Sequence, residues 1–105
     1  MTVFDPSLAS FRARLEALYG DRLERVVLYG SRARGDARSD SDYDIAVFLR
    51  DMPDRWLELD RLADLRVKVL EDEGPFFDVL PYLATTYADL SMPLMREIRN
   101  EGVDI

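Results

Sequence analysis

The stretch "LYGSRARGDARSDSDYDIAVFL", Leu28 to Leu49, joins two apolar runs through a polar loop. The first run, Val26 to Tyr29, and the second, Asp44 to Leu49, each have the length and composition of a β-strand. The second run is apolar at every position after Asp44, which is typical of a strand covered on both faces, in the middle of a sheet. The charged loop between the strands therefore lies beside the core, and its carboxylates need an explanation.

Helical periodicity surrounds these strands. Asp5 or Ser7 can cap a helix that ends at Gly20, and a second helix is expected after a cap at Asp54. A further helix is expected from about Ala88 to Asn100. The apolar positions expected to face the core are Leu8, Phe11, Leu15 and Leu18 in the first helix, and Trp56, Leu59, Leu62, Ala63 and Val69 in the second.

A third strand is expected over Phe76 to Leu80, closed by Pro81. Helices thus alternate with three strands, which predicts the α/β (α+β) class, with a small mixed β-sheet flanked by helices in two or three layers. With 105 residues, the chain is expected to form one domain over residues 1–105.

Composition excludes several kinds of site and partner. The chain contains no cysteine and no histidine, so any metal must be held by oxygen atoms. The net charge of −7 argues against direct binding to a nucleic-acid backbone or to an anionic membrane. No apolar run approaches the roughly 18 residues of a membrane span, and a cytoplasmic location is expected.

Gly30 and Ser31 follow the first strand directly. Glycine lets the backbone approach a ligand closely, and serine can cap a short helix whose exposed amides attract phosphate. A plain turn from strand to helix would use the same two residues. The stretch is not a dinucleotide fingerprint and, without Gly-Lys-Ser/Thr, it is not a Walker loop.

Asp42 and Asp44 are two residues apart, which places both carboxylates on one face of an extended segment. At about 6 Å and an effective dielectric constant near 20, two such charges repel by about 2.8 kcal/mol. A solvated acidic loop explains Asp40 well but Asp44 poorly, because the apolar strand follows at once. A divalent cation between the two carboxylates explains the pair better.

Asp78 is a charged residue inside the apolar third strand. Burying it without a partner would cost several kcal/mol, so it either faces water or an arginine at the strand end, or has a functional partner. If its strand lies beside the one that begins at Asp44, three carboxylates meet, and magnesium would relieve their repulsion.

Together these residues resemble the signature of the DNA polymerase beta-like nucleotidyltransferases, with Gly30-Ser31, a spacer, and then Asp42-Tyr43-Asp44. The segment "GSRARGDARSDSDYDI" looks like the minimal nucleotidyltransferase (MNT) branch, whose loop contains Gly-Ser, Arg-Gly and Ser-Asp-x-Asp. The resemblance runs from about Leu15 to the closing "REIRNEGVDI". It implies the polymerase beta-like nucleotidyltransferase fold.

The resemblance also implies a role for each residue of the signature. Asp42 and Asp44 would hold two magnesium ions on the triphosphate of a nucleotide such as ATP, and Asp78 would share one ion and draw a proton from the acceptor hydroxyl. Gly30 and Ser31 would bind the outer phosphates. The predicted catalytic and metal-binding residues are therefore the three aspartates.

Two arginines in the loop are candidates for nucleotide binding. Arg32 and Arg34 can neutralise phosphate charge, and Arg34 is the preferred one. Pairing with Asp36 or Asp40 within the loop is the alternative, and for Arg32 it is at least as good an explanation.

The MNT resemblance implies a partner. MntA-type members of this branch act as antitoxins to small helical HEPN toxins with RNase-like activity, and some attach AMP from ATP to a tyrosine of the toxin. A hetero-oligomer is expected, because the short chain has room for little beyond the catalytic core. The apolar residues near the C-terminus, which suit either an interface or the core, are Leu90, Met92, Leu94, Met95 and Ile98.

Two other functions compete with transfer to a protein hydroxyl. The chain could neutralise a toxin by binding alone, without catalysis, as a small acidic protein with an apolar patch. Alternatively, the enzyme could transfer a nucleotide to a small molecule or to an RNA end, although the net negative charge disfavours RNA.

Overall fold

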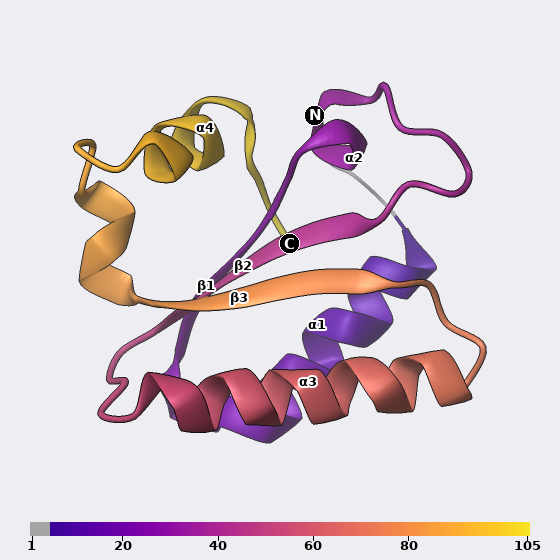
Figure 1. Ribbon diagram of the computed structural model, residues 1–105, viewed down its shortest axis with the longest axis horizontal. Coiled ribbons are helices and arrows are strands. Elements are labelled where there is room, and N and C mark those ends of the chain that lie inside the picture. The colour runs from indigo at the N-terminus through magenta and orange to yellow at the C-terminus, as the bar shows by residue number, and fades with distance from the viewer. Residues whose placement is uncertain (1–4) are drawn as a thin grey trace.

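The computed structural model describes residues 5–105, which form a four-stranded mixed sheet with helices on both faces (Figure 1). Along the chain lie α1 (Pro6–Tyr19), η1 (Gly20–Arg22), β1 (Leu23–Tyr29), α2 (Ser31–Arg34), β2 (Tyr43–Leu49), α3 (Arg55–Glu71), β3 (Phe77–Leu83), η2 (Ala84–Ala88), α4 (Pro93–Glu101) and β4 (Val103–Asp104). The strand order is β3-β2-β1-β4. The predicted α/β class and the central place of β2 are both confirmed.

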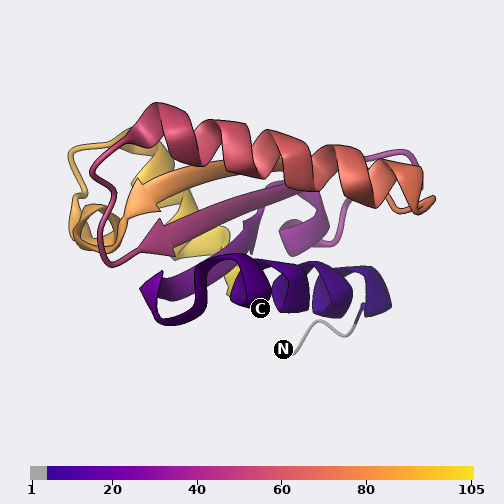
Figure 2. The same ribbon diagram turned by 90° about the horizontal axis from the view of Figure 1, so that it is seen from below.

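The sheet separates two cores. Figures 1 and 2 show α1 and α3 together on one face of the sheet and α4 on the other. Strand residues alternate between the cores, so that Leu28, Ile45 and Val47 pack with α1 and α3. The neighbouring residues Val27, Ala46 and Phe48 pack with Met95 and Ile98 of α4. The architecture therefore has three layers.

The register of β2 decides which polar groups meet. β2 runs antiparallel to β1 and parallel to β3, and Asp44 is the register partner of Tyr29 on one side and of Asp78 on the other. These three residues have the same parity as Ala46 and Phe48, so they lie on the face that α4 partly covers. The start of β2 is therefore the place where the predicted carboxylates can act together.

The sequence analysis predicted that Pro81 closes the third strand, and this prediction is wrong. β3 runs from Phe77 to Leu83, with Pro81 paired in register with Val47. The Phe76 carbonyl accepts a hydrogen bond from the Tyr43 N–H at 3.1 Å, so alternation places the nitrogen of Pro81 on the outer edge of the sheet. No ladder bond is lost there, which is why an edge strand tolerates this proline.

Two large residues expected in the core are exposed. Leu18 is 40% exposed and Trp56 is 79% exposed. In α1, Tyr19 is buried instead of Leu18. Both positions fit helical spacing, because they follow Leu15 by four and three residues. In α3 the buried residues are Glu58, Leu62, Leu65 and Val69. Trp56 lies two residues before Glu58, on a different side of the helix.

The helix expected over residues 88–100 begins later than predicted. The short helix η2 ends at Ala88, and α4 begins at Pro93, where proline fits the first turn. Between them the Asp89 carboxylate accepts hydrogen bonds from the N–H and the hydroxyl of Ser91, which fixes a turn. Of the apolar residues in this segment, Met95 and Ile98 are buried in the core, whereas Leu90 is 51% exposed.

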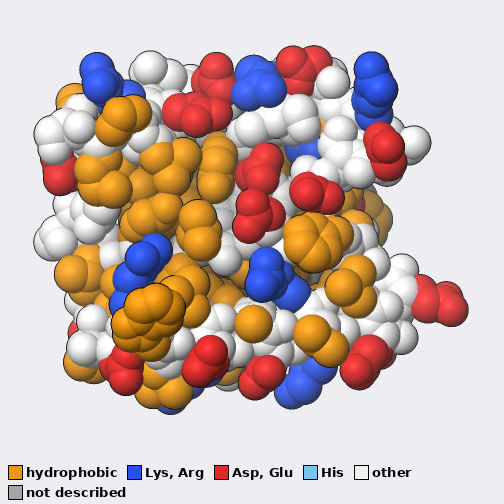
Figure 3. Space-filling model, viewed as in Figure 1, with side chains coloured by type: hydrophobic (Ala, Val, Ile, Leu, Met, Phe, Trp, Pro, Cys, Tyr) orange, Lys and Arg blue, Asp and Glu red, His pale blue; other side chains and the backbone are white. Residues whose placement is uncertain are grey.

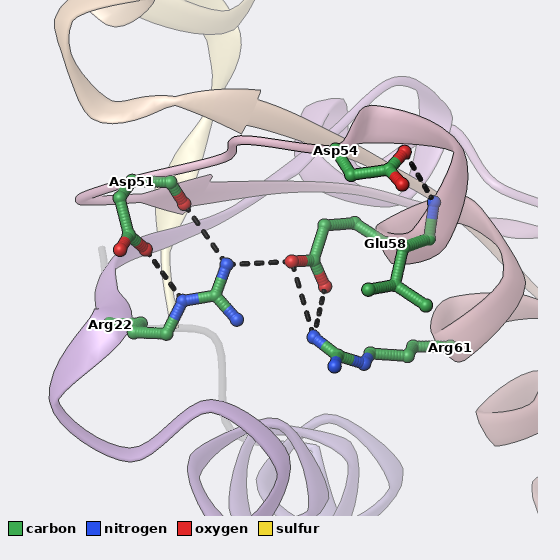
Figure 4. Close-up of polar contacts among 6 residues, drawn as sticks. Arg22, Asp51, Asp54, Glu58 and Arg61 are labelled. Carbon is green, nitrogen blue, oxygen red and sulfur yellow. Dashed lines mark hydrogen bonds and ion pairs between the residues drawn. The ribbon is translucent and has the colours of Figure 1, made fainter.

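The buried charge Glu58 is held at the end of the sheet opposite Asp44 (Figure 4). Its side chain is only 2% exposed, and it accepts hydrogen bonds from Arg22 at 2.6 Å and from Arg61 at 3.1 Å. Arg22 also donates to the side chain and the carbonyl of Asp51, after β2. The network joins the start of β1, the loop after β2 and α3.

We expect Arg22→Gln to destabilise the fold by about 2–3 kcal/mol, and Arg61→Gln by about 1 kcal/mol. The first change leaves Glu58 buried with one weaker partner and releases Asp51, whereas Arg61 pairs with Glu58 only within one helix turn. Urea unfolding of the two variants measures the difference. Equal losses of stability would contradict the ranking.

Within residues 5–105, none of the helices combines the length and the apolar character needed to cross a bilayer.

Candidate active site

Two of the three predicted carboxylates lie side by side on neighbouring strands. Asp44 and Asp78 are register partners on β2 and β3, and both side chains are partly buried. Asp42 precedes β2 and is exposed. Burial, followed by the charges of Asp78 and Asp42, raises the pKa of Asp44 above its ordinary value. The start of β2 is therefore a concentration of negative charge.

Gly30 lies directly against this charge. Its φ angle is +76° and its ψ angle is −156°, a region that side-chain-bearing residues rarely adopt. A Cβ atom at this position would collide with Oδ2 of Asp44. Glycine is therefore required here both by the backbone conformation and by the close approach of the carboxylate.

Ser31 begins the short helix α2, and is partly buried. The Gly30 carbonyl accepts hydrogen bonds from the N–H groups of Ala33 and Arg34, and the Ser31 carbonyl accepts from Gly35 N–H. The turn is closed by these bonds, and it leads the chain from the end of β1 past Asp44. Gly30 and Ser31 thus lie on the β1 side of the carboxylates.

The two candidate arginines have different surroundings. The Arg32 guanidinium donates to the backbone carbonyls of Ser41 and Ser39, at 2.8 and 3.3 Å, and lies over the Tyr43 ring. It therefore holds the loop that carries Asp42. This role within the loop was the alternative expected for Arg32, although its partners are carbonyl groups rather than Asp36 or Asp40.

Arg34 pairs with acidic groups on two segments. It contacts Asp36 at 3.3 Å, and Glu101 and Glu97 of α4 at 3.2 and 3.9 Å. The charge of Arg34 also lowers the pKa of Asp44, but burial and the neighbouring carboxylates raise this pKa by more. The charge of Arg34 thus reaches the carboxylate site, while its pairing with Asp36 is the alternative role that the sequence analysis named; binding of a nucleotide by Arg34 stays a prediction.

Sequence reasoning missed two members of this site. Glu97 on α4 contributes to the raised pKa of Asp44, and burial together with Asp44 raises the pKa of the Tyr29 hydroxyl. The side chain of Tyr29 is 8% exposed, and it faces the carboxylates because of the register of β1 and β2. The pairing of strands could have indicated Tyr29, whereas no signal in the sequence connects Glu97 with β2.

The oxygen-only donor set suits magnesium, although the three aspartates do not form a closed cage. Among residues 5–105, no group of three or more acidic side chains is close enough to hold one cation. Three carboxylates repel one another, and magnesium is usually held by one or two of them, with water and phosphate oxygens as its other ligands. Asp44 and Asp78, with Asp42 nearby, fit this pattern.

Comparison with known proteins identifies relatives along nearly the whole chain. The family "Nucleotidyltransferase domain" matches residues 8–102. "Putative protein adenylyltransferase MJ0141" of Methanocaldococcus jannaschii is 26% identical over 98 residues, covering 93% of this chain and 94% of that protein. "Putative protein adenylyltransferase MJ1305" of the same organism is 39% identical over 64 residues, covering 61% of this chain and 42% of that protein.

Solved structures show the same fold. A crystal structure of a toxin-antitoxin with AMP-PNP superposes with a TM-score of 0.60 at 22% identity, covering 90% of this chain and 69% of that one. A mutant of the toxin-antitoxin MntA-HpeT gives a TM-score of 0.58 at 18% identity, with the same coverage. The family match over residues 8–102 shows that this chain belongs to the nucleotidyltransferase domain family, and the chain is a nucleotidyltransferase.

Proposed function

We propose that this chain is a magnesium-dependent nucleotidyltransferase that transfers AMP from ATP to a hydroxyl group of a partner protein. The observation that carries the proposal is the register of Asp44 with Asp78, on one face of the sheet, with Gly30 against the Asp44 carboxylate. The relatives in Methanocaldococcus jannaschii are both named as protein adenylyltransferases, which supports a protein as the acceptor.

The residues divide the reaction between them. The triphosphate lies at Gly30 and Ser31, and its α-phosphorus lies near Asp44. The Asp78 carboxylate takes the proton of the acceptor hydroxyl, whose oxygen forms a bond to the α-phosphorus. The bond between this phosphorus and the bridging oxygen to the β-phosphate breaks, and pyrophosphate leaves.

Asp42, Asp44 and Asp78 would hold two magnesium ions, which when bound neutralise charge on the attacking and leaving oxygens. Without a cation these carboxylates would repel both each other and the phosphates. Arg34 adds positive charge beside the phosphates once it leaves Glu97 or Glu101. The chain thus supplies the ligands, the phosphate turn and the base.

A toxin is the partner that we propose. Both structural neighbours are toxin-antitoxin proteins, and one of them was crystallised with the ATP analogue AMP-PNP. We infer that this chain is the antitoxin of a HEPN toxin and that it acts in the cytoplasm. It would inactivate the toxin by attaching AMP to one of its hydroxyl groups.

Intact-mass spectrometry tests the reaction and the acceptor together. The chain, co-purified with its partner, is incubated with magnesium and each of the four nucleoside triphosphates in turn. We expect the mass of the partner to rise by whole AMP groups with ATP, and not to change when EDTA removes the metal. A tight complex without any adduct would contradict the proposal and favour neutralisation by binding alone.

The remaining alternatives give different products. Transfer to a small molecule or to RNA would leave both protein masses unchanged while ATP is converted to pyrophosphate and an adenylylated product. Chromatography of the nucleotides after the same incubation separates that outcome from the absence of any reaction. Conversion of ATP with unchanged proteins would therefore contradict the protein acceptor but keep the nucleotidyltransferase.

A further inference from the structure

The groups of the proposed reaction follow one another across the sheet. Gly30 and Ser31 lie at the end of β1, Asp44 at the start of β2 and Asp78 near the start of β3, in the order of the strands. In the proposed reaction the triphosphate occupies the β1 side of Asp44, and the base, Asp78, lies on the β3 side. The acceptor must therefore come from the side of Asp78. The acceptor hydroxyl must approach over β3, the edge strand.

The side chains beyond Asp78 on this face are apolar. Alternation along β3 places Leu80 and Tyr82 on the same face as Asp78, and both are only partly buried. The face on which Val79 and Pro81 lie is buried against the rest of the molecule. An acceptor that reaches Asp78 therefore has an apolar strip beside it.

This strip continues into a larger apolar surface. Figure 3 shows apolar side chains over much of the side that β3 presents, next to a group of acidic ones. Large apolar side chains on the adjoining elements are exposed, including Trp56 of α3 at 79% and Leu90, between η2 and α4, at 51%. An apolar surface of this kind beside a reactive group is typical of a site that binds a protein.

The acceptor does not need to extend the sheet. Pro81 has no N–H and its nitrogen lies on the outer edge of β3, so a strand added at that edge would lack one ladder bond. Contacts of side chains with the face of β3 are therefore the better source of affinity.

We propose that the acceptor protein binds over β3 through apolar side chains that flank its reactive hydroxyl, and that Leu80 and Tyr82 select them. This inference rests on the proposed transfer to a protein hydroxyl. In an extended segment, side chains on the same face are two residues and about 6.6 Å apart. With the hydroxyl at Asp78, the residues two and four positions away lie over Leu80 and Tyr82.

Short synthetic peptides test the selection. Each peptide carries one tyrosine, threonine or serine, with either leucine or glutamine at the positions two and four residues away on both sides. AMP transfer from ATP with magnesium is followed by mass spectrometry, and kcat/KM is compared within each pair. We expect the leucine peptides to be better acceptors on the order of tenfold, because each leucine loses part of its contact with water.

The variant Leu80→Gln/Tyr82→Gln is expected to lose this preference. Binding of α,β-methylene ATP, which cannot release pyrophosphate, should be unchanged, and thermal unfolding reports on the fold. Leu18→Gln is the matched control, because Leu18 is exposed on α1, on the other side of the sheet. That variant should keep the preference for the leucine peptides.

Equal transfer to the leucine and glutamine peptides by the unchanged protein would overturn the inference. If no peptide reacts, labelling of the co-purified partner decides: a slower reaction with Leu80→Gln/Tyr82→Gln supports the inference, and an equal rate contradicts it. No transfer to any peptide or protein would refute the proposed function itself.

Discussion

Asp44→Asn is expected to reduce AMP transfer by at least about 10³-fold and to leave the fold intact. The substitution keeps the size of the side chain but removes a charge that lies between Gly30 and Asp78. An amide oxygen is a weaker ligand for magnesium than a carboxylate, and it cannot offset the charge of the cation. Initial rates of AMP transfer with saturating ATP measure the loss.

The stability of this variant has a definite sign. Burial and the neighbouring carboxylates raise the pKa of Asp44, so at neutral pH its ionised form is less favourable in the folded chain than in the unfolded one. Removing the charge should therefore leave the melting temperature unchanged or raise it. A lower melting temperature would show that the loss of activity comes from damage to the fold.

Asp40→Asn is the matched control for the same loop. Asp40 is exposed and lies outside the signature, so this change should keep the rate within about twofold of the unchanged protein. Full activity of Asp44→Asn, or an equal loss in both variants, would contradict the assignment of Asp44.

The strands could be predicted from their apolar runs, whereas the meeting of Asp44 with Asp78 could be stated only as a condition on how the strands pair. The run from Asp44 to Leu49 is apolar at every position after Asp44, which indicated a central strand, and its residues do pack into both cores. The sequence could not decide whether the strand of Asp78 lay beside that of Asp44. The parallel register of β2 with β3 answers that question.

The ion pairs between residues far apart in the sequence could not be predicted, for a different reason. Arg34 meets Glu97 and Glu101 only because α4 lies over the face that carries Asp44, and the packing of that helix depends on the turn at Asp89. The burial of Glu58 likewise depends on Arg22, which is far away in the sequence. Long-range ion pairs have no periodic pattern by which one sequence could reveal them.

The conformation of Gly30 leads to the second prediction with a large effect. Gly30→Ala is expected to destabilise the fold by about 2–3 kcal/mol and to slow AMP transfer by about 10²-fold. At a φ of +76° and a ψ of −156°, alanine is strained, and its Cβ would collide with the Asp44 carboxylate. The carboxylate must move away, and with it one side of the site. Urea unfolding and transfer rates measure the two effects.

Gly35→Ala separates strain of the backbone from displacement of Asp44. Gly35 also has a positive φ, +86°, but a Cβ atom there would meet nothing within 4 Å, so only strain of about 1 kcal/mol is expected. Transfer by Gly35→Ala should then remain close to that of the unchanged protein. If the two alanine variants lose activity equally, flexibility of the loop rather than the contact of Gly30 with Asp44 controls the reaction. A larger loss for Gly30→Ala, at equal occupancy by ATP, assigns the effect to the position of the carboxylate.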